Sequence, residues 1–296
     1  MSMVTKKYAA IDIGSNAVRL MIMMVHQTNE STFFKKVSLT RVPIRLGEDV
    51  FLKNKISRRN ISRMIHAMKA FHHLIKLHEV INYSACATSA MRDSTNGSEL
   101  VETIFEQTGL KINVISGKEE AEIIYQMHIE EKIDASKNYV YIDIGGGSTE
   151  ITIFEKGVPT NSKSFNIGTI RLLHSLVENK EWDDMKSWFK THVAHLNSAL
   201  AIGSGGNVNR LHKMAGKTDW ATLDLDYLKK QQKYLGGFSY EDRVTELNMN
   251  MDRADVIMPA LKILIQSMKW SKCEELIVPK MGLADGLVRR MHAETK

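Results

Sequence analysis

The sequence has few cysteines and no long apolar run. Its only cysteines, Cys86 and Cys273, show no metal-ligand spacing, so we expect both to be buried, reduced thiols. The longest apolar run, residues 20–25, is far too short to cross a bilayer. Residues 1–7 also lack the apolar region of a signal peptide, and we therefore expect a cytoplasmic protein.

The composition is that of a folded protein with an uneven charge. Apolar residues make up 43% and charged residues 25% of the 296 positions, which excludes a disordered chain. Residues 1–125 carry 17 Lys and Arg against 12 Asp and Glu, whereas residues 126–296 carry 23 against 22. Such a bias favours an anionic partner but does not distinguish polyphosphate, nucleotide or RNA. Much of the excess positive charge lies in residues 53–63, which are either the solvated start of a helix or a binding patch.

One segment of the chain occurs twice. Residues 8–14 return as residues 139–145, with five of the seven positions identical at a constant offset. In each copy a short apolar run ends in Asp, Gly and small polar residues, after which an apolar or alternating run resumes. This pattern predicts a strand, a tight turn and a second strand in each half of the chain.

The two predicted turns have the composition of phosphate-binding loops. Successive glycines and small hydroxylated residues let backbone N–H groups converge on an anion without obstruction by Cβ atoms. Asp12 and Asp143 precede these loops, where a carboxylate can bind Mg²⁺. The alternative is that each Asp only stabilises its own turn, but repetition in both halves favours a functional role.

The wider pattern predicts a two-domain α/β protein. Strands alternate with helices, which favours helices on both faces of each sheet, and we expect domains at residues 1–125 and 126–296. Apolar residues from 61 to 75 follow helical spacing, with Ser57 or Asn60 as the cap. A second helix is predicted to begin at Ser116 or Gly117 and to cross to the second domain.

Three further features have both a functional and a structural interpretation. Glu119 and Glu120 are adjacent near a helix start, so one could be a general base, or both could interact with the helix dipole. Arg92 could contact phosphate or form a surface ion pair. A glycine-rich turn could admit a phosphate or nucleotide, although such turns are common after buried strands: Gly203, Ser204, Gly205, Gly206 and Asn207.

Taken in order, several motifs resemble the Ppx/GppA family of exopolyphosphatases and guanosine pentaphosphate phosphohydrolases. The most specific are Ser-Gly-Lys-Glu-Glu-Ala at residues 116–121 and Asp-Ile-Gly-Gly-Gly-Ser-Thr-Glu at residues 143–150. The others are residues 11–16, 87–92, 203–207 and 253–257. The resemblance implies an actin-like, duplicated ribonuclease-H-type fold with two domains around a central cleft. It also implies Mg²⁺-assisted hydrolysis of a terminal phosphoanhydride bond.

The resemblance assigns roles by motif position. Glu120 is similar to the catalytic base, and Asp143 and Glu150 resemble the residues that organise the metal and the catalytic water. Asp12 stays a further candidate metal ligand because of its place before the first loop. The residues that resemble the phosphate-binding set are Gly14, Ser15, Asn16, Arg92, Gly145, Gly146, Gly147 and Ser148. Two positions depart from the family pattern, because Ala284 stands where Arg is frequent and Ala260 where Gly is frequent.

The expected substrate is inorganic polyphosphate or guanosine penta- or tetraphosphate. The expected cofactor is Mg²⁺, with other divalent cations and monovalent K⁺ left open. We expect no membrane or nucleic-acid partner, and a homodimer is left open. Two alternatives remain, an actin-like phosphotransferase of the acetate or sugar kinase class and a non-catalytic nucleotide-binding sensor. Residues 116–121 favour hydrolysis over the first, and the set of Glu120, Asp143 and Glu150 argues against the second.

Overall fold

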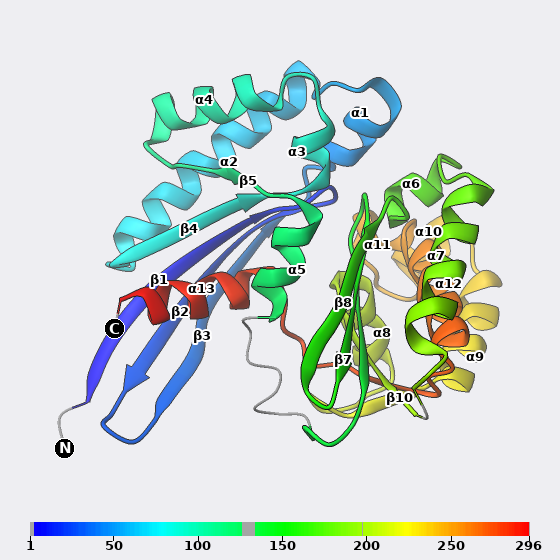
Figure 1. The fold of residues 1–296 in the computed structure, drawn as a ribbon. Helices are drawn as coiled ribbons and strands as arrows, with labels where there is room; N and C mark the ends of the chain where they lie inside the picture. Colours follow the sequence, from blue (N-terminus) through cyan, green and yellow to red (C-terminus); the bar gives the residue numbers. More distant parts are fainter. Residues whose placement is uncertain (1–2, 126–133, 197, 296) are drawn as a thin grey trace. The chain divides into compact units, whose positions relative to one another are not determined.

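The computed structural model describes residues 3–125, 134–196 and 198–295. Its contacts divide the chain into two compact units. One comprises residues 1–127 together with residues 283–296, and the other comprises residues 128–282. The first unit is therefore built from two segments that are widely separated in the sequence (Figure 1).

The first unit contains a five-stranded mixed sheet in the order β3-β2-β1-β4-β5. Its strands are β1 (Val4–Ile13), β2 (Val18–Gln27), β3 (Thr32–Val42), β4 (Asn82–Ala87) and β5 (Asn113–Val114). Strands β1, β2 and β3 are antiparallel neighbours, whereas β4 and β5 continue the sheet parallel to β1. Period-two alternation along β1 sends Ile11 to one face of the sheet and Asp12 to the other.

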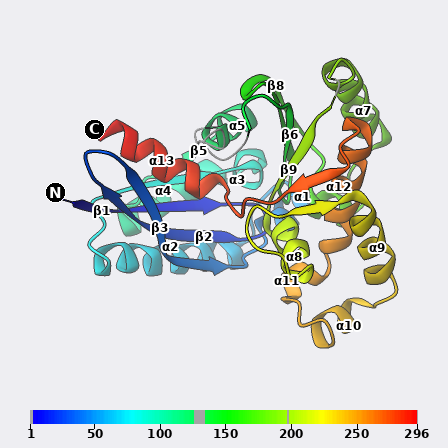
Figure 2. The ribbon, with the colours of Figure 1, turned by 90° about the horizontal axis from the view of Figure 1, so that it is seen from below.

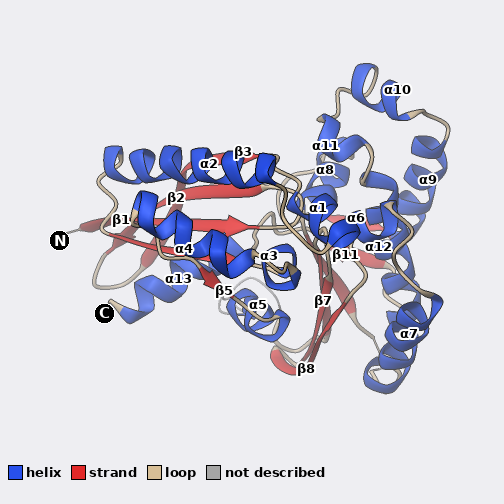
Figure 3. Cartoon of the chain, turned by 90° about the horizontal axis from the view of Figure 1, so that it is seen from above, coloured by secondary structure: helices blue, strands red, loops and turns tan. Residues whose placement is uncertain are grey.

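Helices cover both faces of this sheet, as the sequence predicts. They are α1 (Leu46–Lys53), α2 (Arg58–Leu77), α3 (Ser89–Asp93), α4 (Gly97–Thr108), α5 (Gly117–Tyr125) and α13 (Leu283–Glu294). The first four share a core with one face, and α5 and α13 share a core with the other. Figures 2 and 3 show α2 and α13 on opposite sides of β1.

Helix α2 begins where its capping residue satisfies a backbone donor. The Ser57 hydroxyl accepts a hydrogen bond from the N–H of Asn60 at 3.3 Å. Of the two predicted candidates, Ser57 is therefore the cap. The apolar side chains at helical spacing are buried, and they include Met64, Met68 and Phe71. Their burial on one stripe is what holds this helix against the sheet.

The second unit contains a six-stranded mixed sheet in the order β10-β11-β9-β6-β7-β8. Its strands are β6 (Tyr139–Ile144), β7 (Thr149–Glu155), β8 (Val158–Phe165), β9 (Leu200–Ser204), β10 (Thr222–Asp224) and β11 (Glu275–Ile277). Its helices are α6 (Thr169–Leu173), α7 (Asn179–Val193), α8 (Gly206–Met214), α9 (Leu225–Gly236), α10 (Tyr240–Thr245), α11 (Met251–Ala254) and α12 (Ile257–Ser271). The apolar helix α12 packs against α6, α7, α9 and β6 and forms the centre of the core.

The sequence repeat is confirmed by the topology. The order β8-β7-β6-β9-β11 in the second unit matches β3-β2-β1-β4-β5 in the first, with the same parallel and antiparallel pairings. Strand β10 is an additional edge strand. The hairpins β1–β2 and β6–β7 are therefore equivalent position by position, with Asp12 matching Asp143.

The unit to which α13 belongs differs from the one expected from the sequence. The sequence analysis assigned residues 126–296 to one domain, whereas α13 belongs to the first unit. The physical reason is its apolar stripe, including Leu287, Val288 and Met291, which is buried against β1 and β4. The expected boundary and the expected crossing of the α5 helix fall at residues 126–133, outside the described residues.

Both cysteines are buried and reduced, as expected. Burial raises the pKa of each thiol to about 11, so neither Cys86 nor Cys273 is a thiolate at neutral pH. No helix in the described part of the chain is long and apolar enough to cross a membrane.

Candidate active site

The two glycine-containing loops form the same turn. In the first unit the N–H of Gly14 donates to the carbonyl of Ala17 at 3.2 Å. At the equivalent position of the second unit, the N–H of Gly145 donates to the carbonyl of Ser148 at 3.0 Å. A Cβ atom on Gly14 or Gly145 would lie only 3.3 or 3.1 Å from the accepting carbonyl oxygen, which explains glycine at both positions.

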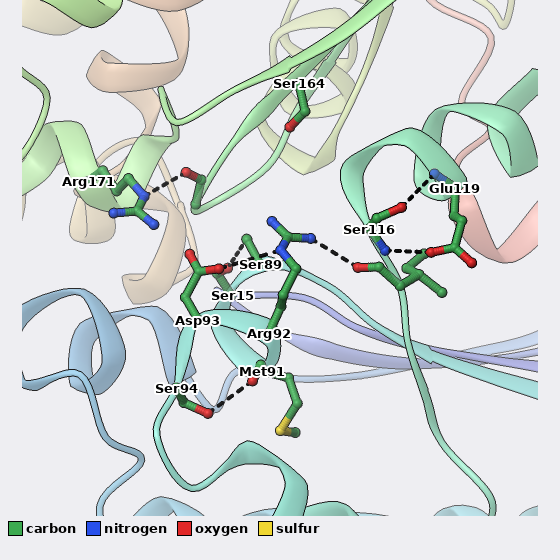
Figure 4. A network of polar contacts seen from close by, with 12 residues as sticks. Ser15, Ser89, Met91, Arg92, Asp93, Ser94, Ser116, Glu119, Ser164 and Arg171 are labelled. Atoms are coloured by element: carbon green, nitrogen blue, oxygen red, sulfur yellow. Dashed lines mark hydrogen bonds and ion pairs between the residues drawn. The ribbon is translucent and has the colours of Figure 1, made fainter.

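The first loop is fixed by two neighbouring helices. The N–H of Gly47, in α1, donates to the carbonyl of Ser15 at 2.8 Å, and the N–H of Arg45 donates to the carbonyl of Asn16 at 3.1 Å. The hydroxyl of Ser15 shares a 2.9 Å hydrogen bond with the hydroxyl of Ser89 in α3 (Figure 4). These bonds occupy loop carbonyls and hold the turn in one conformation.

The second loop has its carbonyls occupied while two of its amides are available. The carbonyls of Gly145 and Gly146 accept from backbone N–H groups of Thr169 and Ile170, and the Gly147 carbonyl accepts from Nε of Arg171 at 2.9 Å. Within the described residues the amides of Gly146 and Gly147 donate to no protein acceptor. Amides of this kind can bind phosphate oxygens.

The close approach of α6 to this loop depends on one further glycine. A Cβ atom on Gly168 would lie 2.3 Å from the carbonyl carbon of Gly147 and 2.4 Å from the oxygen of Gly146. Only glycine permits this contact, which the sequence analysis did not identify.

A row of polar side chains crosses the sheet of the second unit beside this loop. Asp143 on β6 is directly opposite Glu150 on β7, and Glu150 is opposite Ser164 on β8. On the other side Asp143 is the parallel partner of Ser204 on β9. The Ser204 hydroxyl donates to Asp143 at 2.7 Å, and the Ser164 hydroxyl donates to Glu150 at 2.8 Å.

This acidic row has the donors of a divalent cation site. Like charges directly opposite on neighbouring strands repel each other, and only 2% of Glu150 is exposed. A hard cation would relieve that repulsion, because carboxylate oxygens are its preferred ligands. No group of three or more His, Cys, Asp or Glu within the described part of the chain could hold a metal ion. Asp143 and Glu150 supply two carboxylates, which suits a divalent cation whose shell is completed by water and phosphate.

The equivalent row in the first unit is different in charge. Its members are Cys86, Asp12, Arg19 and Arg41, on four neighbouring strands. The guanidinium of Arg19 donates from Nη1 to Oδ2 of Asp12 at 2.6 Å. Arg19 stands at the position of Glu150, so Asp12 already has a cationic partner. The geometry supports a cation site at Asp143 more than at Asp12, whose role as a ligand stays a prediction.

The two adjacent glutamates of α5 have different environments. The N–H of Ser116 donates to Oε2 of Glu119 at 2.8 Å, and the N–H of Glu119 donates to the Ser116 hydroxyl at 3.2 Å (Figure 4). This reciprocal pair is a capping box, and its hydrogen bonds from Ser116 lower the pKa of Glu119. Glu120 instead is buried, with 9% of its surface exposed. Glu119 has a structural role, which leaves Glu120 as the candidate base.

Arg92 connects α3 to the start of α5. Its Nη1 donates to the carbonyl of Ile115 at 3.0 Å, and its Nε lies 3.4 Å from the carboxylate of Asp93 (Figure 4). The side chain is partly buried, so neither a purely exposed ion pair nor a free cation describes it. Its predicted contact with phosphate stays a prediction.

The third glycine-rich turn joins β9 to α8. Gly205 has a φ of +114°, and a Cβ atom there would lie 2.7 Å from the carbonyl oxygen of Ile144. A nucleotide role for Gly203, Gly206 and Asn207 stays a prediction. The same holds for Ser204 and Gly205, and the Ser204 hydroxyl also donates to Asp143.

Comparison with known proteins gives one family. A sequence model of the Ppx/GppA phosphatase family matches residues 24–294. The bifunctional 3-dehydroquinate synthase/phosphatase of Fusobacterium nucleatum is 34% identical over 200 residues, which cover 64% of this chain and 30% of that protein. Exopolyphosphatase 1 of Mycobacterium tuberculosis is 23% identical over 310 aligned residues, covering 96% of this chain and 88% of the relative.

A third relative is the guanosine-5′-triphosphate,3′-diphosphate pyrophosphatase of Aliivibrio fischeri. It is 26% identical over 301 aligned residues, covering 97% of this chain and 59% of the relative. The chain thus spans less than two thirds of the length of this relative and of the Fusobacterium protein.

A solved structure has the same fold. The crystal structure of an exopolyphosphatase from Cytophaga hutchinsonii matches with a TM-score of 0.84 at 22% identity, covering 98% of this chain and 99% of that chain. Together with the duplicated mixed sheets, this likeness confirms the predicted actin-like fold.

Proposed function

Because the chain belongs to the Ppx/GppA phosphatase family, we propose that it hydrolyses the terminal phosphoanhydride bond of a phosphate chain and releases orthophosphate. The proposed substrates are inorganic polyphosphate and the 5′-triphosphate end of guanosine pentaphosphate, which share this bond. The observation that carries the proposal is the row of Asp143 and Glu150 beside a loop whose Gly146 and Gly147 amides are available.

Each loop would bind phosphate through its own backbone amides. The amides of Gly146 and Gly147 would donate to nonbridging phosphate oxygens, and the equivalent turn at Ser15 would do the same in the first unit. Because these amides are fixed by the bonds to α1, α3 and α6, they need no reorganisation when charge develops on the reacting phosphate.

Asp143 and Glu150 would hold a divalent cation, which when bound neutralises phosphate charge and polarises the bond to be broken. The hydroxyls of Ser204 and Ser164 donate to these carboxylates and fix which oxygens face the cation. This second layer of hydrogen bonds holds the two side chains in place before substrate arrives.

Glu120 would act on water as a general base. As the water oxygen forms a bond to the terminal phosphorus, the Glu120 carboxylate accepts a proton, and the bond from phosphorus to the bridging oxygen breaks. The products are orthophosphate and a chain shorter by one phosphate. Burial of Glu120 excludes competing solvent, and the capping box at Ser116 and Glu119 fixes the start of its helix.

The proposal is tested by phosphate release in the absence of any acceptor. Purified protein with Mg²⁺ is incubated separately with polyphosphate and guanosine pentaphosphate, and orthophosphate is measured over time. We expect release from at least one substrate, and the ratio of kcat/KM values identifies the preferred one. Transfer to acetate or a sugar, with no release in its absence, would instead indicate a phosphotransferase.

The matched variants are Glu120→Gln and Glu119→Gln. We expect the first to lower turnover by about 10² or more while substrate still binds, because the amide keeps the shape but cannot accept the proton. The second should change turnover by only a few fold, because glutamine can also close a capping box. Equal losses for the two variants would contradict the assignment of Glu120.

A further inference from the structure

Helix α13 forms part of the surface on which α5 packs. Helix α13 returns to the first unit and packs against β1, β4 and α5. Its apolar residues share a core with Ile123 of α5, and they are Leu283, Ala284, Leu287, Val288 and Met291. Helix α5, which carries Glu120, therefore lies on a surface that residues near the end of the sequence provide.

The two helices approach each other most closely at Gly286. A Cβ atom at this position would lie 2.2 Å from the carbonyl oxygen and 3.0 Å from the carbonyl carbon of Ile123. It would also lie 2.9 Å from Cγ2 of the same residue. Because two of these atoms belong to the backbone, no side-chain rotation of Ile123 can make room, and any side chain at Gly286 must move a helix.

Helix α13 is held at both ends. Asp285 in its first turn accepts from Nζ of Lys36 on β3 at 2.9 Å. Near its other end the ring of His292 meets that of Tyr8 edge-on with centroids 5.9 Å apart, and the hydroxyl of Thr295, the residue after the helix, shares a 2.9 Å hydrogen bond with the hydroxyl of Tyr8. Displacement caused by a larger residue at Gly286 therefore falls on α5.

Glu120 is one turn from the contact. Residues three apart on a helix lie on neighbouring positions of the same side, so Glu120 and Ile123 move together when the helix backbone shifts. Both are buried. A misplacement of about 1 Å in a reacting group can reduce turnover by about 10².

We propose that Gly286 is a positioning residue, which sets the location of Glu120 by allowing α13 to contact the backbone of α5. This inference rests on the proposed function, because it takes Glu120 as the base. It predicts that Gly286 controls turnover without contacting substrate, although it has no polar side-chain atom and lies far from Ile123 in the sequence.

The test compares two helical glycines that differ in their surroundings. Gly286→Ala introduces the clash, whereas Gly236→Ala, in α9, has its nearest neighbour, Cε of Met258, at 3.7 Å. Alanine has a higher helix propensity than glycine, so neither change disfavours its helix by propensity. We expect Gly286→Ala to lower kcat about tenfold or more with KM within about twofold of wild type, and Gly236→Ala to leave both unchanged.

A second pair tests the same contact without a clash. Ile123→Ala leaves a cavity between α5 and α13, which weakens the packing that positions α5. The control, Ile104→Ala, removes an equally buried isoleucine from α4 on the opposite face of the sheet. We expect a lower kcat for the first only. Thermal unfolding of all four variants identifies any that fail to fold, and the remaining pair then decides the question.

A double-mutant cycle with Glu120→Gln separates positioning from general damage. If Gly286 acts through Glu120, adding Gly286→Ala or Ile123→Ala to Glu120→Gln gives little further loss of kcat. Multiplied losses, or kcat within twofold of wild type for both single variants, would overturn the positioning role and leave the proposed function intact. Wild-type kcat for Glu120→Gln alone would overturn the proposed base, and the positioning role with it.

Discussion

Arg19 occupies in the first unit the position that Glu150 occupies in the second. Each lies directly opposite the aspartate of its hairpin, Asp12 on β1 or Asp143 on β6. One duplicated hairpin therefore contains an ion pair, at 2.6 Å, and the other contains two carboxylates. A single change of charge at equivalent positions distinguishes the two hairpins, because the second places two carboxylates, the preferred ligands of a hard cation, on neighbouring strands.

The first prediction concerns the cation site. Asp143→Asn and Glu150→Gln should each move the midpoint of activation by Mg²⁺ to a concentration higher by about tenfold or more, because an amide oxygen lacks the charge that holds a hard cation against water. Titration of phosphate release with Mg²⁺ measures the shift. The comparison variant is Asp12→Asn, for which we expect a smaller shift, because Asp12 already pairs with Arg19. An equal shift for Asp12→Asn would make it a ligand as well.

The Asp12–Arg19 pair should contribute to the free energy of unfolding. The side chain of Asp12 is 8% exposed and that of Arg19 is 34% exposed, so Arg19→Gln leaves a mostly buried carboxylate without its cation, at a cost of about 2 kcal/mol. Urea denaturation measures the change. Adding Asp12→Asn should recover part of the loss, as expected for coupled residues.

A surface pair provides the control for this measurement. Lys7 and Glu79 are 4.0 Å apart, and the glutamate is largely exposed, so Lys7→Gln should change the unfolding free energy by about 0.5 kcal/mol or less. Equal losses of unfolding free energy for Lys7→Gln and Arg19→Gln would show that the burial of Asp12 does not strengthen its pairing with Arg19.

Gly205→Ala should be strongly destabilising. The new Cβ atom would lie 2.7 Å from the Ile144 carbonyl oxygen on a backbone with φ of +114°, so we expect a loss of about 3 kcal/mol. Gly216→Ala is the matched control, because Gly216 also has positive φ, +65°, but has nothing within 4 Å of the new atom. Its cost should be about 1 kcal/mol. Thermal unfolding measures the loss of stability in each variant, and equal losses would contradict this account.

Asp49 should make stability depend on pH. Burial acts to raise its pKa, but hydrogen bonds from Ser57 and Asn60 outweigh burial and lower the pKa below the ordinary value of 3.8. A depressed folded-state pKa contributes stability that is present above the unfolded value and is lost as pH falls through the folded value. The stability difference between wild type and Asp49→Asn should therefore be constant from about pH 5 to 7 and should shrink below about pH 4.

The measurement for Asp49 is urea denaturation of both proteins across that range. Taking the difference removes the contributions of the other acidic groups, which the two proteins share. A difference that stays constant at acid pH would show that the charge of Asp49 does not stabilise the start of α2.

Much of the fold was accessible from local sequence patterns. Asp12 and Asp143 recur in the same apolar and glycine context, and that context alone predicts two hairpins with equivalent turns. Ser57 also marks the start of α2, because a capping hydroxyl leaves a local signal. Such features depend on neighbours within a few residues, and for this reason they are predictable.

Features set by distant contacts were missed. Ser164 donates to Glu150 on another strand, and no local pattern distinguishes it from an ordinary serine. Ser204 was recognised as part of a glycine-rich turn but not as the partner of Asp143. Arg19 could have been found, because extending the repeat beyond its identical positions aligns it with Glu150. Glu119 and Glu120 could not be separated from residue types alone, since their different burial decides between them and burial is set by tertiary packing.

The return of α13 to the first unit has a consequence for synthesis. Residues 128–282 are continuous in sequence, so the second unit can fold as soon as it leaves the ribosome, whereas the first unit must wait for α13 although its strands are made first. Until then the sheet face around Tyr8 and Cys86 lacks its cover. We expect nascent chains ending before residue 283 to be cleaved by protease within the first unit while the second resists. Equal resistance of both units in such chains would contradict this order of folding.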